Sequence, residues 1–327
     1  TKTMYSIPVV ALDSAGLTSP NRPFRFDTFY TLYDKRFPNA KAPSQSFLEW
    51  LVGFTEGDGS FTINSRGTAI FVITQSTSNY CSATTRTAGA YANQLQVLEY
   101  IQRTLGFGRV IKQGPRTSRF VVEDIDSVAL LIALFNGNLV FPLKQASFAL
   151  FLEAFNKRSR AKATQAGGGV SQPQAVEFIP SLVTPTIHDF WLSGITDAEG
   201  CFNCSLLGNS KAYRFRFLLA ATHATHATHA TQQIGEANLT VLTHITTLIG
   251  GIVRPHSKPG VNELTVNGAR NVERVFKYFD THPLYTKKAI SYQIWREVHA
   301  SILKGEHLSP ASRATLKAKA ATINKVN

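Results

Sequence analysis

The spacing of apolar positions predicts a short helix that passes directly into a strand. Between residues 48 and 55, apolar or methyl-bearing side chains recur at i, i+3, i+4 and i+7, which is the spacing of one helix face. Polar and apolar residues then alternate over residues 60–64, which is the period of a strand. The same succession returns 141 residues later, over residues 190–202. Such an internal repeat predicts two similar half-domains that meet about a pseudo-two-fold axis.

Small residues lie at matching places in both predicted helices. Gly53 and Gly57 are four residues apart, as are Gly194 and Ala198. Because small side chains let two helix backbones approach closely, we expect the two helices to pack against each other. Each apolar run is short and carries carboxylates, which excludes a transmembrane interpretation of these two helices.

A carboxylate precedes the glycine that follows each predicted helix. Asp58 and Glu199 lie at the negative pole of a helix dipole, and the pseudo-two-fold axis would bring them together, so that they repel each other. A divalent cation between them removes both penalties, and hard oxygen ligands suit Mg²⁺. Single acids at helix ends are usually just solvated, but the repeated arrangement favours a metal site. We expect Gly59 and Gly200 to adopt a left-handed conformation that ends each helix.

The remaining pattern predicts the other elements of the first half. Strands are expected up to residue 80, helices near residues 92–105, 126–135 and 143–156, and a second hairpin after the helix that ends at residue 105. In the second predicted strand, Phe71 and Ile73 lie on one face, and the residues that alternate with them lie on the other.

The chain divides into four predicted parts. Residues 1–45 form an N-terminal extension whose aromatic residues are expected to pack on the body, and residues 46–158 form the first half-domain. Residues 159–182 are predicted as a linker because they contain three consecutive glycines and recurring prolines, and residues 183–327 form the second half-domain.

Charge and composition narrow the class of partner. The formal net charge of +13 and the pI of about 9.7 indicate a polyanionic partner, and the motif-bearing duplication favours nucleic acid. Three cysteines exclude a disulfide framework, and Cys201 and Cys204 are expected on opposite faces of a strand rather than in a zinc or redox site. An Ala-Thr-His repeat over residues 221–231 is interpreted as a mobile loop on the DNA side rather than a metal site.

The repeated segments carry a family resemblance. LVGFTEGDG at residues 51–59 and LSGITDAEG at residues 192–200 resemble the two copies of the LAGLIDADG motif. Residues 46–325 therefore resemble a single-chain LAGLIDADG homing endonuclease of the type encoded in organellar introns. The resemblance implies an α+β fold with two pseudo-symmetric αββαββα half-domains, each with a four-stranded antiparallel DNA-binding sheet, joined at paired motif helices.

The resemblance also implies an activity and a location. It implies a monomer that hydrolyses both strands of a long asymmetric site in double-stranded DNA and leaves short 3′ overhangs. The implied cofactor is Mg²⁺, for which Mn²⁺ or Ca²⁺ can substitute structurally, and the implied location is mitochondrial.

Several residues receive roles from this resemblance. Asp58 and Glu199 would bind the cations, with the backbone carbonyls of Gly57 and Ala198 as neighbours. One cation would activate water and another would stabilise the leaving 3′ oxygen.

Three further polar positions complete the implied site. Gln75 resembles the polar residue that orders the catalytic water, and its counterpart is expected to be Ala221, so that the two sites are not equivalent. This difference leaves the relative cleavage rates of the two strands open and allows a bias toward nicking one of them. Lys144 and Lys287, in segments similar to Pro-Leu-x-x-Lys, would either stabilise phosphate charge or neutralise the backbone.

The polar face of each predicted sheet is expected to lie in a major groove of DNA. A merely solvated face would explain the alternation equally well. The predicted DNA contacts are Ser60, Thr62, Asn64, Arg66, Thr68, Ile70, Val72, Thr74, Arg109, Gln113, Arg116, Arg119, Asn203, Ser205, Arg214, Arg216, Leu218, Arg254 and His256.

Three alternatives compete with the nuclease interpretation. The same fold could belong to an intron RNA maturase, or to a DNA-binding protein that has lost cleavage; the intact acids favour cleavage but do not exclude a second activity. An aspartic protease also places two duplicated acids together, but it needs an Asp-Thr/Ser-Gly loop in each half. Asp58-Gly-Ser and Glu199-Gly-Cys do not supply that loop.

Overall fold

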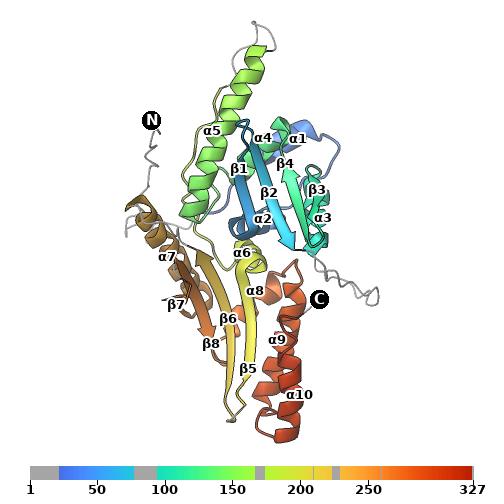
Figure 1. The fold of residues 1–327 in the computed structure, drawn as a ribbon, viewed down its shortest axis with the longest axis vertical. Coiled ribbons are helices and arrows are strands. Elements are labelled where there is room, and N and C mark those ends of the chain that lie inside the picture. Colours follow the sequence, from blue (N-terminus) through green and yellow to red (C-terminus); the bar gives the residue numbers. More distant parts are fainter. Residues whose placement is uncertain are drawn as a thin grey trace.

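Two four-stranded antiparallel sheets, each covered by helices, form the two halves of the chain (Figure 1). The computed structural model describes residues 22–76, 94–165, 174–208, 210–222, 229–258 and 260–325. Two helices, α2 and α6, lie side by side between the sheets, and the remaining helices cover the outside of one half or the other (Figure 1).

The elements follow the same order in each half. The first half contains α1 (Asp27–Arg36), α2 (Gln45–Asp58), β1 (Gly59–Ile63), β2 (Ala69–Ser76), α3 (Gln94–Leu105), β3 (Arg109–Gly114), β4 (Thr117–Val122), α4 (Ile125–Phe135) and α5 (Pro142–Gln165). The second half contains α6 (Trp191–Glu199), β5 (Gly200–Leu206), β6 (Tyr213–Thr222), α7 (His229–Ile249), β7 (Ile252–Pro255), β8 (Val261–Asn267), α8 (Glu273–Thr281), α9 (Lys288–Leu303) and α10 (Pro310–Ala320).

The strand pairing shows that the two halves are copies of one plan. The strand order is β1-β2-β4-β3 in the first sheet and β5-β6-β8-β7 in the second. The registers also correspond, because Gly59 pairs with Ile73 and Gly200 pairs with Leu219. The predicted α+β fold with two four-stranded antiparallel sheets is confirmed.

Each sheet buries one face against the helices of its own half. In β2, Phe71 and Ile73 are fully buried, whereas Ile70 and Val72 keep partial exposure. Alternation of this kind is expected where one sheet face packs on the core and the other does not. The aromatic residues of the N-terminal segment join this core, since Phe29 on α1 is fully buried and α1 packs against α4.

Glycines bring α2 and α6 into direct backbone contact. A Cβ atom at Gly53 would collide with the carbonyl oxygen of Trp191 and lie 2.9 Å from the amide nitrogen of Ile195. A Cβ atom at Gly194 would collide in the same way with the carbonyl oxygen of Trp50. Because the obstructing atoms belong to backbone, neither side chain rotation nor repacking can make room. The predicted close approach of the two helices is therefore present.

The conformations of Gly59 and Gly200 differ from our prediction. Their φ angles are −83° and −74°, in the extended region rather than the left-handed one. Glycine is needed here for space, because a Cβ atom on Gly59 would lie 2.5 Å from Cγ2 of Thr55, with the equivalent contact to Thr196 in the other half. Each helix thus passes into its strand without a left-handed residue.

The last helix of the first half is longer than predicted. α5 continues to Gln165 rather than ending near residue 156, and it projects beyond the body of the first half (Figure 1). Arg, Ala, Lys and Gln in its last turns are good helix formers, and no glycine occurs there before Gly167. Part of the predicted linker is therefore helical.

The last two predictions concern the Ala-Thr-His repeat and the absence of membrane-spanning helices. Most of the Ala-Thr-His repeat, residues 223–228, lies outside the described residues. Among the described helices, none has the length and apolar character that a bilayer crossing requires.

Candidate active site between the two halves

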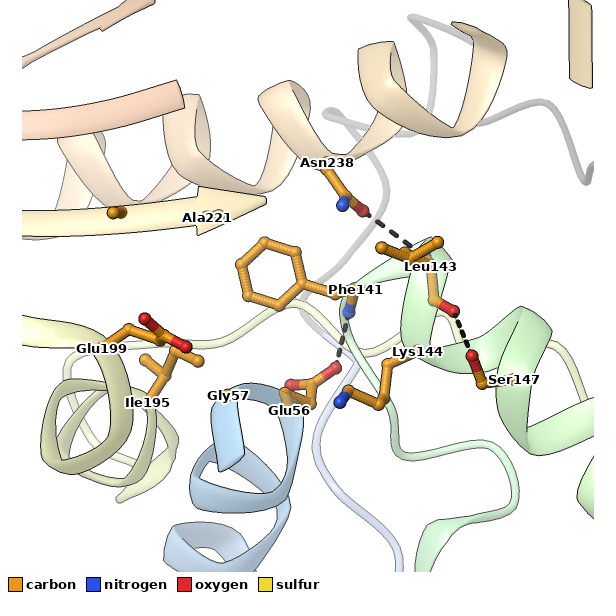
Figure 2. A pocket seen from close by; sticks show the side chains of 11 residues that line it. Glu56, Gly57, Phe141, Leu143, Lys144, Ser147, Ile195, Glu199, Ala221 and Asn238 are labelled. Atoms are coloured by element: carbon orange, nitrogen blue, oxygen red, sulfur yellow. Dashed lines mark hydrogen bonds between the residues drawn. The ribbon is translucent and has the colours of Figure 1, made fainter. Parts of the chain in front are cut away.

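The two acidic helix ends meet at the contact between the halves. α2 ends at Asp58 and α6 ends at Glu199. A Cβ atom at Gly57 would collide with that of Ala198 and lie 3.5 Å from Oε1 of Glu199, so the carboxylate of Glu199 lies over the end of α2 (Figure 2). The close packing of α2 on α6 thus brings together the acids that the sequence places far apart.

Burial, and in one case a neighbouring charge, raises the pKa of both carboxylates. Burial raises the pKa of Asp58, which the hydrogen bond from Gln75 and the charges of Lys288 and Lys144 lower in part. Burial and then the charge of Asp58 raise the pKa of Glu199, and the same two lysines oppose this shift. Glu199 has an exposed side chain, so solvent screens part of the effect.

The donor set suits a hard divalent cation. The charge of Asp58 raises the pKa of Glu199, and a cation between the two carboxylates would relieve this repulsion. Carboxylate and carbonyl oxygens are also the ligands that Mg²⁺ and Ca²⁺ prefer. Within the described residues, no cluster of three or more His, Cys, Asp or Glu side chains suggests a different kind of metal site.

One lysine from each half reaches the acidic helix ends. Lys144 donates from Nζ to the carbonyl oxygen of Gly59 at 2.6 Å. Lys288 donates from Nζ to the carbonyl oxygens of Ala198 and Thr196 at 2.7 and 3.0 Å. Burial lowers the pKa of both lysines, and the acids of the site raise it.

The structure places Lys288, rather than the predicted Lys287, in the site. Lys287 is the N-cap residue of α9, and Lys288 begins the helix. The spacing from the preceding proline does not transfer between the halves, because Lys144 follows Pro142 by two residues and Lys288 follows Pro283 by five. The intervening loop of the second half shifts the lysine along the chain.

The two acids differ in their polar neighbours. Gln75 is buried and donates from Nε2 to Oδ2 of Asp58 at 2.6 Å. The strand registers identify Ala221 as the counterpart of Gln75, since each lies two residues beyond the partner of the glycine that opens β1 or β5.

A cavity adjoins Ala221 and Glu199 in the second half. Its volume is about 210 Å³, and its lining includes Ala220, Ala221, Glu199, Lys144 and Asn238. Figure 2 shows Ala221 on β6 facing the side of the site that holds Glu199. The two halves of the site are therefore not equivalent.

The predicted DNA contacts lie on or beside the outer faces of the two sheets. In the first sheet, Ser60 pairs with Val72, Val72 pairs with Val121, and Val121 pairs with Arg109. These four residues therefore lie in one row on the same face. The residues on the outer face of the strands are Ser60, Thr62, Ile70, Val72, Thr74, Arg109, Gln113 and Arg119 in the first half and Asn203, Ser205, Arg214, Arg216, Leu218 and Arg254 in the second. Arg66, Thr68 and Arg116 lie in turns, and His256 follows β7.

Some of these side chains already have partners in the protein. Asn64 accepts hydrogen bonds at Oδ1 from the amides of Arg66 and Thr68, both at 2.9 Å, and so stabilises the β1–β2 turn. Arg109 forms an exposed ion pair with Glu123 at 2.6 Å. By contrast, Nε of Arg119 and of Arg216 is buried and has no hydrogen-bond acceptor within the described residues.

Sequence reasoning missed several residues of these faces. Ile111 and Ile252 are exposed apolar side chains, and Ile252 pairs with Thr265 on the outer face of the second sheet. The alternation that predicted Arg109 and Gln113 already placed Ile111 between them, so a complete application of the same rule would have found it.

Two like halves, a pair of glycine-packed helices that each end in an acid, and two antiparallel sheets define the fold of LAGLIDADG endonucleases. The chain belongs to the LAGLIDADG endonuclease family, because residues 51–155 and residues 192–299 both match the model of that family. The predicted family membership is confirmed.

Relatives and solved structures agree with this assignment. The chain is 31% identical over 288 residues to "Probable intron-encoded endonuclease 4" of Neurospora crassa, in a match that covers 85% of this chain and 44% of that protein. It is 20% identical over 283 residues to the uncharacterized cox1 intron-2 37.2 kDa protein of Schizosaccharomyces pombe, covering 84% of this chain and 72% of that protein. The chain thus spans less than half the length of the Neurospora relative.

The fold is shared with a solved homing endonuclease. The structure of I-SmaMI bound to cleaved DNA matches with a TM-score of 0.61 at 18% identity, covering 88% of this chain and 100% of that one. I-SmaMI bound to an uncleaved DNA target in the presence of calcium ions matches with a TM-score of 0.59 at 17% identity, covering 85% and 98%. At this identity the likeness establishes the fold.

Proposed function

We propose that this chain is a homing endonuclease that hydrolyses both strands of a long asymmetric site in double-stranded DNA. The observation that carries the proposal is the convergence of Asp58 and Glu199, with one lysine from each half, at the contact between two sheets whose outer faces carry arginines. The match to the LAGLIDADG endonuclease model supports the reaction class.

Asp58, Glu199 and the carbonyl oxygens of Gly57 and Ala198 would hold the divalent cations, with Mg²⁺ as the proposed species. Bound Mg²⁺ would activate water and stabilise the leaving 3′ oxygen. Gln75 holds the carboxylate of Asp58 in one orientation through its 2.6 Å hydrogen bond. Lys144 and Lys288 place positive charge beside the position that the scissile phosphates would occupy.

The two sheets would read the DNA from successive major grooves. Arg119 and Arg216 suit this role because both side chains are partly exposed on the outer faces of the sheets. Arginine side chains on an outer sheet face can bind guanine through two hydrogen bonds, and apolar residues such as Leu218 can contact thymine methyl groups. The net charge of +13 favours binding to the phosphate backbone.

We further propose that the protein acts as a monomer, leaves short 3′ overhangs and functions in mitochondria. The duplicated halves supply both acids from a single chain, which supports a monomer. The names of the relatives refer to cox1 and ND4 introns, which supports an organellar origin.

A cleavage selection tests this function. The purified chain is incubated with Mg²⁺ and a plasmid library that carries a randomised insert, and linear products are recovered and sequenced. We expect enrichment of one asymmetric sequence about two helical turns long. Recovery of no cleaved sequence, or of the same products from an Asp58→Asn/Glu199→Gln double variant, would contradict the proposal.

A further inference from the structure

Two buried carboxylates at the contact between the halves take no part in the proposed metal site. Glu56 is 7% exposed and lies on α2, and Asp197 is 4% exposed and lies on α6. These interface carboxylates occupy equivalent positions, each two residues before the acid that ends its helix. A buried carboxylate is costly unless its oxygens accept hydrogen bonds, so their partners show what they stabilise.

Glu56 joins three segments of the chain. Its Oε1 accepts hydrogen bonds from the backbone amides of Val140 and Phe141, both at 2.6 Å. Its Oε2 accepts the indole N–H of Trp191, which belongs to α6 in the other half. Val140 and Phe141 directly precede α5, the helix that carries Lys144 on its first turn (Figure 2).

Asp197 repeats this arrangement in the second half. Its Oδ2 accepts from the amide of Tyr285 at 2.7 Å and from the indole N–H of Trp50, on α2, at 2.9 Å. Its Oδ1 accepts from the amide and the hydroxyl of Thr286. Tyr285 and Thr286 precede Lys288, the first residue of α9.

Each interface carboxylate therefore fixes the backbone from which an active-site lysine extends. Lys144 lies four residues beyond Val140 and reaches the carbonyl oxygen of Gly59, beside Asp58. Lys288 lies two residues beyond Thr286 and reaches the carbonyl oxygen of Ala198, beside Glu199. The same carboxylate binds an indole of the opposite half, so the position of each lysine is tied to the packing of α2 on α6.

We propose that Glu56 and Asp197 are positioning residues: each places the lysine of its own half at the adjacent active-site acid, and each ties that placement to the opposite half through a tryptophan. The proposal deepens the proposed function and rests on it. It predicts that the loss of one interface carboxylate impairs cleavage of one strand more than the other, because each lysine donates to a backbone carbonyl next to a different acid, although the charges of both lysines reach both acids.

The chemistry of the amide side chain makes Glu56→Gln and Asp197→Asn informative variants. Both oxygens of each carboxylate accept hydrogen bonds, whereas an amide has only one oxygen and presents N–H groups at the other position. In Glu56→Gln the amide N–H₂ group would face either the indole N–H of Trp191 or the two backbone amides. The shape is retained while part of the hydrogen bonding is lost.

Strand-resolved single-turnover cleavage of the selected DNA site tests the proposal. We expect Glu56→Gln to slow cleavage of one strand about 10- to 100-fold relative to the other, with the DNA Kd unchanged, and Asp197→Asn to show the opposite strand bias. Glu49→Gln is the matched control, since Glu49 is a buried carboxylate on the same helix that accepts from Gln45 and from the amide of Phe190. Within the described part of the chain it has no hydrogen bond to residues 140–144 or 285–288. Equal slowing of both strands, or rates equal to those of Glu49→Gln, would overturn the proposal.

Hydrogen exchange provides a readout that does not depend on cleavage. We expect Glu56→Gln to accelerate exchange of the backbone amides of Val140 and Phe141, while Glu49→Gln leaves them protected. If Glu56→Gln does not fold, Trp191→Phe takes its place, because it removes one donor to Glu56 and keeps the aromatic packing. We expect this variant to slow cleavage less than Glu56→Gln would, with the same strand bias. Wild-type protein that cuts no DNA would contradict the proposed function, whereas unchanged exchange at these two amides would contradict the positioning role alone.

Discussion

A single side chain separates the chemical environments of the two active-site acids. Gln75 donates to Asp58, whereas its counterpart Ala221 has no polar group and lines, together with Glu199, a cavity of about 210 Å³. A carboxylate fixed by a buried hydrogen bond has fewer orientations to lose when it binds a cation or a water. Asp58 is therefore better ordered for binding a cation than Glu199.

Exchanging the residues at these two positions should change the order of strand cleavage. We expect Ala221→Gln to fill the cavity, donate to Glu199 and accelerate cleavage of the slower strand, and Gln75→Ala to slow the faster strand about tenfold. Time courses with each strand labelled separately measure both rates. An unchanged ratio of strand rates in both variants would show that this position does not control the asymmetry.

The buried acid at the start of α6 should make stability depend on pH. Burial raises the pKa of Asp189 to about 6, although Thr186 and Trp191 donate hydrogen bonds to it. The pKa of the side chain is about 4 in the unfolded state, so the protonated carboxyl group stabilises the folded state fully below pH 4. This stabilisation is lost as the pH rises to about 6. Relative to Asp189→Asn, the free energy of unfolding should fall by about 3 kcal/mol over this interval. Denaturant titrations of both proteins at pH 4 to 7 measure this change in the free energy of unfolding. If the free energies of wild type and Asp189→Asn changed in parallel with pH, Asp189 would not be the source of the pH dependence.

The sequence predicted the residues whose roles depend on local spacing. The duplicated motif singled out Asp58 and Glu199, and the family resemblance singled out Gln75, before the structure. Lys288 was misplaced by one residue, because the length of the loop before α9 has no counterpart in the first half. Glu56 and Asp197 received no role from the sequence, since their partners lie 84 to 147 residues away in the chain.

At the scale of elements, the contact between α2 and α6 determines where the acids meet. Gly194→Ala would drive a methyl group into the backbone of α2 at Trp50 and place it 2.8 Å from the amide nitrogen of Phe54. We expect a loss of at least about 2 kcal/mol in the free energy of unfolding, together with loss of cleavage. Thermal and denaturant unfolding measure the first quantity.

Gly114→Ala is the matched control for this substitution. A Cβ atom at Gly114 meets nothing within 4 Å, and its φ lies outside the left-handed region. The change in the free energy of unfolding should stay within about 0.5 kcal/mol. Equal effects of the two substitutions would mean that the backbone contact of the two helices does not limit stability.

The C-terminal helix should organise the end of the second sheet that lies farthest from the acids. Arg313 on α10 donates to the carbonyl oxygens of Leu207, Ser210 and Ala212 at 2.7, 2.8 and 3.0 Å, and these residues belong to the β5–β6 connection. We expect Arg313→Ala to relax base preference at the outer positions of that half-site while the cleavage position is unchanged. Cleavage profiling on a library measures this, and Lys317→Ala on the same helix is the basic control. An identical profile for wild type and Arg313→Ala would exclude the role.

Element boundaries followed the sequence pattern closely, and the differences have physical causes. The helices predicted near residues 92–105 and 126–135 occur at Gln94–Leu105 and Ile125–Phe135. Gly59 and Gly200 were correctly predicted at the helix ends, but the predicted reason, a left-handed conformation, was wrong. Glycine is required there because a Cβ atom would collide with the threonine four residues earlier. Packing against a neighbouring side chain is invisible to a rule based on local conformation.

At the scale of the whole molecule, duplication gives one chain two sheets and two acids about a shared axis. Both sheets have the same strand order, and both outer faces carry arginines, while the acids lie at the contact between the halves. A basic chain of this shape can bind adjacent grooves of one duplex and act on both strands between them. The sequence predicted this plan because the repeat is explicit in it, and the strand registers agree with the predicted correspondence of Gln75 and Ala221.

Cleavage of the selected DNA site by the single variants Asp58→Asn and Glu199→Gln tests the central claim most directly. These substitutions remove the negative charge of one acid and retain its shape. Our account predicts that each variant loses at least about 100-fold in Mg²⁺-dependent cleavage while its DNA Kd stays within about threefold of wild type. Wild-type rates in either variant, or cleavage by the wild type that persists in excess EDTA, would contradict it.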